Sequence, residues 1–184
     1  MVQSAPWQVE RLDWEGRKAF VSRTRADYYT DAIDYTRLKI LERFGETASS
    51  AVSHGEVHLV RRIAGYKNIR YYTHENIGYG NIDLPDQEMH TTAVWWQVSP
   101  TALDAAFASR QQALDGFLGA GYALHIVAAM RMLSEPRDIG RAVGDGNAEW
   151  FATVGASGRG SLMNSRGEAV DPASLPRFTP TLFL

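Results

Sequence analysis

The chain has 184 residues, 45% of them hydrophobic, so it is long and apolar enough to fold around a core. A net charge of -2 does not by itself indicate nucleic-acid binding, and the absence of cysteine excludes disulfides, cysteine nucleophiles and thiolate zinc ligands. The first residues lack a signal-peptide pattern, and no run of about 18 consecutive apolar residues occurs. We therefore expect a cytoplasmic protein with no membrane contact.

Residues 1–98 have the patterns of β-strands. Residues 7–13 and 18–21 flank Gly16, which can supply the positive φ of a tight turn, so they predict a β-hairpin. In residues 36–43, Leu38 and Ile40 share one face and the opposite face is mostly basic. This alternation is typical of a half-buried strand.

A second hairpin is expected further along. Residues 54–63 alternate with Val57 inward, and Gly65 then allows a turn into a strand over residues 67–73. The glycine-rich residues 76–81 are typical of a turn. Residues 91–98 are β-branched and aromatic, and the alternation predicts that Trp96 points inward and Trp95 outward.

Residues 99–184 predict helices followed by a loop-rich tail. Ser99 is a helix-capping residue and Pro100 suits a first turn, so we expect a helix from residue 100 to about residue 117. Glycines follow, and residues 122–133 are then apolar on nearly every side, which predicts a helix in the protein interior. Residues 179–184 resemble a buried strand, an unusual end for a domain, so we expect a segment of a longer protein.

The fold class that these patterns predict is α+β. We expect a mostly antiparallel β-sheet or a partly open small barrel, followed by two packed helices and the loop-rich tail. The expected division is a β-rich half at 1–98 and a helical half at 99–184, packed as one compact unit.

Motifs for complete enzymes are absent. No Gly-Lys-Ser or Gly-Lys-Thr occurs, and the glycines of residues 155–160 lack the lysine of a phosphate-binding loop. No Gly-x-Ser-x-Gly sequence is present for a serine hydrolase. Acidic residues gather around the glycine-rich loop without a diagnostic spacing: Glu75, Asp83, Asp86 and Glu88. We therefore assign no catalytic residue and expect no cofactor in this chain.

A metal site is a weaker candidate. His54, Glu56 and His58 would share one face of a strand, and His90 could complete a set of ligands. Solvated polar strand faces are far commoner than metal sites, and spacing alone cannot show the partners that orient ligating histidines. His125, within the apolar helix, fits a hydrogen-bonded core histidine better than a ligand.

The most informative segment is residues 61–74, where basic and aromatic residues interleave. Four cations lie there with no acidic residue between them. Cations on a sheet can neutralise phosphates while aromatic rings stack on unpaired bases. The candidate nucleic-acid-binding residues are Arg61, Arg62, Lys67, Arg70, Tyr71, Tyr72 and Trp95. Tyrosines in strands also pack across sheets, and arginines pair with carboxylates, so a purely structural role stays open.

Several segments also resemble a known family. They are residues 27–34, residues 65–70, Tyr72-Thr-His-Glu-Asn-Ile-Gly-Tyr-Gly80, and residues 83–95, followed in order by residues 119–132, 137–140 and 179–184. Together they resemble the C-terminal region of bacterial DEAD/DEAH-box DNA helicases of the mitomycin repair factor type.

The resemblance implies a parent protein with ATP-driven unwinding in DNA repair or in defence against foreign DNA. In that family two motor lobes that use ATP and Mg²⁺ precede this region, and a four-cysteine zinc domain follows it. This sequence contains neither. The resemblance thus implies a noncatalytic accessory segment whose partners are single-stranded or forked DNA, the motor lobes and the zinc domain.

Two other functions remain open at this stage. The segment could be a scaffold that braces the motor lobes against the zinc domain, using Trp95, Trp96 and the apolar end at residues 182–184. It could also be a metal-binding β-domain with its own activity.

Overall fold

The computed structural model describes residues 5–47, 51–82, 84–154 and 159–184. These residues group into two compact units. The first unit contains residues 1–34 and 63–84, and the second contains residues 35–62 and 85–184. The boundary between the predicted halves, at residue 98, lies inside the second unit. Strands before it and helices after it belong to that same unit.

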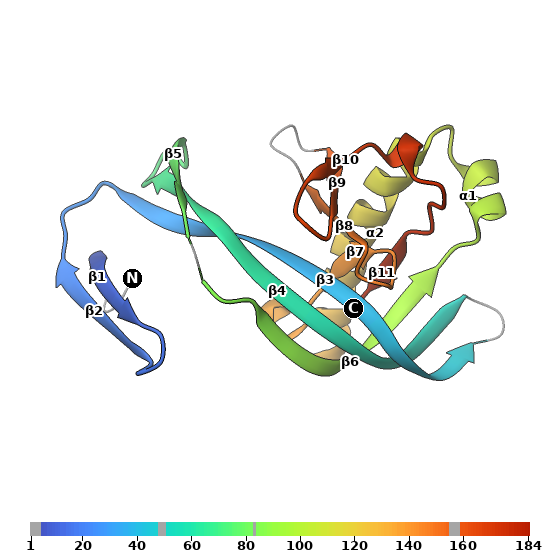
Figure 1. Cartoon of the computed structure of the whole chain (residues 1–184), viewed down its shortest axis with the longest axis horizontal. Helices are drawn as coiled ribbons and strands as arrows, with labels where there is room; N and C mark the ends of the chain where they lie inside the picture. Colours follow the sequence, from blue (N-terminus) through green and yellow to red (C-terminus); the bar gives the residue numbers. More distant parts are fainter. Residues whose placement is uncertain (1–4, 48–50, 83, 155–158) are drawn as a thin grey trace. The chain divides into compact units, whose positions relative to one another are not determined.

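Antiparallel strands dominate the described residues, as Figure 1 shows. A short hairpin pairs β1 (Trp7–Asp13) with β2 (Lys18–Arg23). The larger sheet has the order β10-β9-β8-β7-β11-β6-β4-β3, and β5 pairs with β4 outside that order. Its strands are β3 (Tyr28–Thr47), β4 (Val52–Arg70), β5 (Asn76–Asn81), β6 (Gln87–Gln97), β7 (Ala142–Gly144), β8 (Trp150–Val154), β9 (Gly160–Asn164), β10 (Ala169–Val170) and β11 (Thr181–Phe183). With its helices, the chain has the α+β fold that the sequence predicted.

The first hairpin forms as predicted, but with a different turn residue. The positive φ lies at Arg17 (52°) and not at Gly16, whose amide donates a 2.8 Å hydrogen bond to Oδ1 of Asp13. The carboxylate of Asp13 occupies the space beside Gly16 that a Cβ would need. A side chain at residue 16 would therefore displace the Asp13 carboxylate.

The predicted second hairpin is wrong, because β4 continues without a turn at Gly65. Gly65 lies opposite Asn81 of β5, and a Cβ at this position would be 2.7 Å from the carbonyl oxygen of Gly80. The residue permits a close approach of two strands. The chain reverses only after Arg70, at residues 71–74.

The glycine-rich residues 76–81, predicted as a turn, form β5 and pair with residues 65–69 of β4. The ring of Tyr66 lies against Gly80, where an added Cβ would be 2.2 Å from Cζ of Tyr66. Gly80 therefore leaves the space that the ring of Tyr66 occupies. A glycine that makes room for packing cannot be told from a turn glycine by composition.

The first predicted helix is shorter than expected. It is α1 (Pro100–Ala106) and ends at Ala106. The Ser99 hydroxyl caps it by accepting a hydrogen bond from the amide of Ala102 at 3.3 Å. Phe107 is extended, and Ser109 caps a second helix, α2 (Arg110–Met132). The glycines predicted to break the helix lie inside α2, where Gly121 leaves room for the side chain of Leu182 on β11.

Helix α2 packs against β7, β8, β9 and β11, and Figure 1 shows it beside these strands. Its buried residues are Ala113, Leu114, Phe117, Gly121, His125 and Ala129. The prediction of a wholly interior helix is wrong for this chain, since Tyr122 and Met130 are 58% and 70% exposed. By length and composition alone, α2 is also long and apolar enough to cross a membrane.

The core of the second unit has two clusters. The larger joins α1 and α2 to the strands and to Phe178, whose ring stacks on Trp150 at 5.7 Å between centroids. The smaller contains Leu38, Val57, Ala93, Trp95 and Phe183. Strand β11 lies between β6 and β7, so the apolar end of the sequence is a central strand. The predicted buried strand is confirmed, and Leu182 and Phe183 are unavailable as the exposed scaffold surface considered above.

Candidate nucleic-acid interface

The turn between β4 and β5, residues 71–74, is held by backbone hydrogen bonds. The amide of Tyr71 donates to the carbonyl oxygen of Asp27 at 2.9 Å, and the amide of His74 donates to that of Arg70 at 3.1 Å. Tyr72 and His74 have φ values of 69° and 54°, in the left-handed region. Such conformations cost about 1–3 kcal/mol each outside glycine and persist only where surrounding contacts enforce them.

The strained turn presents an aromatic side chain to solvent. Tyr72 is 98% exposed, while Tyr71 beneath it is partly buried. The ring of Tyr71 lies between those of Tyr29 and Tyr72, with centroid distances of 5.6 and 6.4 Å. The hydroxyl of Tyr29 is 3.4 Å from Nδ1 of His74. We call residues 70–75 with Tyr29 the tyrosine turn.

Two carboxylates offset the charge at Arg70. Its Nη1 donates to Oε2 of Glu75 at 3.1 Å, and its Nε lies 3.8 Å from Oδ2 of Asp27. These ion pairs join both ends of the turn to the residue that precedes β3. The Arg70 side chain thus has two acidic partners, and it remains 45% exposed.

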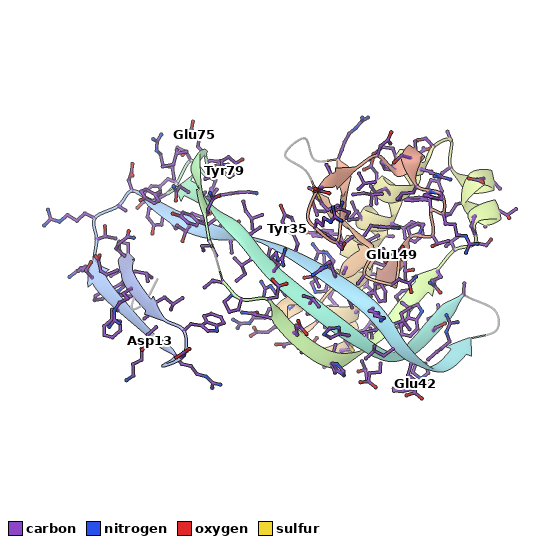
Figure 2. The ribbon with its side chains drawn as sticks, in the orientation of Figure 1. Asp13, Tyr35, Glu42, Glu75, Tyr79 and Glu149 are labelled. Carbon is purple, nitrogen blue, oxygen red and sulfur yellow. The ribbon has the colours of Figure 1, made fainter. Side chains whose placement is uncertain are left out.

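Lys67 and Tyr79 lie on the two strands that lead into and out of this turn. They lie opposite each other in the β4–β5 pair, and Tyr79 is 66% exposed. Figure 2 labels Glu75 and Tyr79 at this hairpin. Within the described part of the chain, no carboxylate pairs with Lys67. Sequence reasoning missed Tyr79, because residues 76–81 were predicted as a turn and not as a strand.

Arg61 and Arg62 belong to the second unit, so the predicted cations fall in both units. Arg62 binds Asp86 through Nε and Nη2 at 2.8 and 3.0 Å, and Arg37 lies 3.8 Å from the same carboxylate. The hydrogen bond from Arg62 lowers the pKa of Asp86, and the carboxylate raises the pKa of Arg62. Arg62 and Arg70 therefore pair with carboxylates, the structural role that the sequence left open for the arginines. Asp86 and Glu75 come from outside the 61–74 segment, so its composition concealed them.

The predicted outward orientation of Trp95 is wrong. The side chain is fully buried, with Phe183 at 6.2 Å between ring centroids and the guanidinium of Arg43 5.8 Å from its ring. Its Nε1 has no hydrogen-bond partner among the described residues. Trp96, on the other face, packs partly against the helical core cluster. Both faces of β6 are covered here, so a period of two cannot say which tryptophan is outward.

The candidate metal ligands form pairs instead of a cluster. His58 and His90 face each other across β4 and β6 with ring centroids 5.2 Å apart. Each imidazole binds a carboxylate at 3.1 Å, His58 that of Glu88 and His90 that of Glu56. His54 lies farther along β4, opposite Val94, against the ring of Phe44. No group of three or more possible ligands occurs among the described residues.

The remaining titratable candidates have structural partners. Glu88 is bound to His58 and Glu75 to Arg70, while Asp83 lies outside the described residues, as does the start of the glycine run at 155–158. His125 is 9% exposed, and its Nε2 donates to the carbonyl oxygens of Pro136 and Ile139 at 2.6 and 2.8 Å. The prediction of a hydrogen-bonded core histidine is confirmed.

Sequence reasoning also missed Asp145, an acidic residue buried after β7. Its carboxylate accepts from the amides of Asn147 and Glu149 at 2.9 and 3.2 Å, while burial raises its pKa. These hydrogen bonds close the turn into β8, so Asp145 has a structural role in that turn.

Comparison with known proteins finds similarity to helicases. No protein-family model matches it. The ATP-dependent helicase YprA of Bacillus subtilis (strain 168) is 35% identical over 116 residues, which are 62% of this chain and 16% of YprA. The crystal structure of the DUF1998 helicase MrfA bound to DNA matches 98% of this chain with a TM-score of 0.53 and 25% identity. This chain is homologous to part of a helicase.

The helicase-like resemblance seen in the sequence is thereby confirmed. The chain spans only 16% of YprA and covers 20% of the solved MrfA chain. It therefore corresponds to a segment of these helicases, while its own described residues fold as an α+β arrangement of sheet and helices.

Proposed function

We propose that this chain is a noncatalytic accessory region of an ATP-dependent DNA helicase, and that it contacts DNA through the tyrosine turn. The observation that carries the proposal is the match of nearly the whole chain to a helicase solved with DNA bound. The tyrosine turn supplies a matching chemistry. Tyr72 of the turn exposes its ring, and Lys67, which pairs with no carboxylate among the described residues, lies in the same compact unit.

Single-stranded DNA suits this arrangement better than duplex DNA. An unpaired base exposes its π-face, and a stack on an aromatic ring contributes about 1–3 kcal/mol without regard to sequence. Tyr72 offers an open ring held by a constrained backbone, so little conformational freedom is lost when a base stacks on it. Lys67 would neutralise a backbone phosphate beside the ring.

The role of the parent helicase is inferred from the family resemblance and not from the geometry of the tyrosine turn. The region would lie in the C-terminal part of a cytoplasmic helicase acting in DNA repair or defence. ATP and Mg²⁺ would bind the motor lobes, and zinc would bind a cysteine domain, all outside these 184 residues. Arg61 and Arg62 would form a second, weaker phosphate contact, because the strong pairing of Arg62 with Asp86 competes with DNA.

Fluorescence anisotropy of the chain with labelled single-stranded, duplex and forked DNA across a salt series tests this function. We expect salt-sensitive binding that favours DNA with unpaired bases. Lys67→Ala should weaken binding, whereas Lys18→Ala, on the β1–β2 hairpin, is the matched control and should not. Absence of binding by a folded chain, or equal loss in both variants, would contradict a DNA contact at the tyrosine turn.

A further inference from the structure

Helix α2 has an exposed face without a single charge over about four turns. Between residues 116 and 130 every exposed position is glycine, alanine, valine, isoleucine, methionine or tyrosine. We call these residues the outer face of α2: Gly116, Gly119, Ala120, Tyr122, Ala123, Ile126, Val127 and Met130. A surface helix of a soluble protein normally carries charged and polar residues on this side.

The large side chains of the outer face are substantially exposed. Val127 is 51% exposed, Ile126 39% and Met130 70%, while the opposite side of α2 is buried against the sheet. Scattered exposed apolar residues are normal, but a continuous apolar face marks a surface that another structure covers. The apolar sequence predicted a helix buried on all sides, but α2 is buried on only one side.

Arg141, which follows α2 in the chain, contacts Tyr122 at the edge of this face. Arg141 lies with its guanidinium carbon 5.0 Å from the ring of Tyr122, and its Nη1 donates to Nδ1 of His125 at 2.9 Å. Because Nδ1 accepts this bond, His125 is the neutral tautomer with its proton on Nε2. This chain of contacts orients the Tyr122 ring before any partner arrives.

The shape of the face suits a packed helix. Gly119 has no atom within 4 Å of the position a Cβ would take, and Ala120 and Ala123 are small. A low strip therefore runs beside the ridge of Tyr122, Ile126 and Met130. Ridges of one helix pack into such grooves of another at interaxial distances of about 8–10 Å.

We propose that the outer face of α2 docks permanently against an apolar helix from the rest of the helicase chain to which this segment belongs. In the homologous solved structure the matching region is 20% of the chain, so about four-fifths of such a protein lies outside this fold. Interfaces that never open are the ones that resemble a domain core in composition, and this face has that composition. The inference rests on the helicase part of the proposed function and not on its DNA contacts.

Two other occupants are outcomes of the test. A second copy of this chain would give a dimer through the same face. A lipid bilayer is the other, because α2 is long and apolar enough to span one, with 22% of its most apolar window buried.

Methionine oxidation reports directly on this face. Met130 is 70% exposed on α2, and Met89, 53% exposed on β6, is an internal reference. In the isolated 184-residue chain, dilute peroxide should oxidise the two at similar rates, read by mass spectrometry. In the full-length protein encoded by the gene, Met130 should oxidise more slowly than Met89 by about fivefold or more, because oxidation follows exposure. Equal rates there, or a reading frame of only these residues, would overturn the proposal.

Paired charge substitutions separate the occupants. Ile126→Glu should leave the isolated chain folded but lower the thermal stability of the full-length protein, while Val154→Glu, at a 63% exposed position, should change neither. A dimer of the isolated chain that Ile126→Glu dissociates, or liposome binding that it abolishes, would overturn the proposal in favour of a second copy or a membrane. DNA binding by the isolated Ile126→Glu chain should equal that of the unchanged chain. A failure of the docking proposal can therefore be told apart from a failure of the proposed DNA contact.

Discussion

The tyrosine turn and the seam between β6 and β11 place similar aromatic residues in opposite environments. Tyr72 is 98% exposed at the end of a two-stranded ladder, whereas Trp95 is fully buried where β6 pairs with β11. The sequence predicted both residues as rings that stack on bases. The difference teaches that the neighbouring strands decide the role of a ring, because a central strand is covered and a hairpin turn is not.

The same contrast holds for the backbone. Trp95 lies within a regular ladder opposite Phe183, so its backbone is unstrained and its side chain contributes packing energy. Tyr72 occupies a left-handed conformation that costs energy and gains no burial. A strained residue with an exposed ring is more readily explained by binding than by stability.

The largest expected effect is on stability, at the seam. Trp95→Ala should destabilise the chain by about 3–5 kcal/mol, because a buried ring leaves a cavity in the cluster with Val57 and Phe183. Denaturant unfolding measures this loss. Trp14→Ala is the matched control, since Trp14 is 47% exposed on the first hairpin and its truncation should change stability little. Equal losses in the two variants would refute the burial of Trp95.

The next effect is on DNA binding, at the turn. Tyr72→Ala should weaken binding to single-stranded DNA by roughly 1–3 kcal/mol, the contribution of one base stack. Its unfolding free energy should stay within about 0.5 kcal/mol, as is usual at exposed positions. Tyr122→Ala, at a 58% exposed position on α2, is the control and should bind normally. Loss of affinity in both variants would point to a general effect of removing surface rings.

A smaller effect concerns the salt dependence. Lys67→Ala should flatten the slope of log affinity against log salt by about 0.7, the value for one phosphate contact on a single strand. The change should be the same for different DNA sequences, since phosphates carry no sequence information. An unchanged slope would mean that Lys67 does not contact the backbone, whatever the role of Tyr72.

The smallest effect is a pH dependence in the second unit. Arg62 lowers the folded-state pKa of Asp86 below its usual 3.8, so the pair stabilises the fold above that pH and loses its effect as the pH falls through the lowered pKa. Asp86→Asn should therefore cost at most about 1 kcal/mol at pH 7, because Arg62 is half-exposed. The difference from the unchanged chain should vanish in acid. Thermal melts between pH 2 and 7 measure it, with Asp104→Asn as an exposed control that should show no such trend.

Local patterns predicted much of the fold. The first hairpin, the inward face at Val57 and the Ser99 cap all follow from periodicity and capping chemistry, which act over a few residues. The turn expected at Gly65 failed, because that glycine makes room for a distant strand that local sequence does not reveal.

The candidate site was predicted in outline and not in detail. Alternating cations and rings drew attention to residues 61–74, and Tyr71 and Tyr72 lie in a turn there, with Tyr72 exposed. The ion pairs of Arg62 and Arg70 depend on Asp86, Glu75 and Asp27, which the fold brings in from outside that segment. The burial of Trp95 depends likewise on β11, more than 80 residues later in the chain. Such long-range partners are set by topology, which a single sequence does not specify.

The central claim is that the tyrosine turn contacts unpaired DNA, and photochemical crosslinking tests it most directly. A single-stranded oligonucleotide with 5-iododeoxyuridine would be irradiated with the chain, and the crosslinked residue located by tandem mass spectrometry. The account predicts a crosslink at Tyr72, or at Tyr79 on the adjoining strand, that excess unlabelled single strand abolishes. Crosslinks confined to peptides of the second unit, with none in residues 67–80, would contradict it.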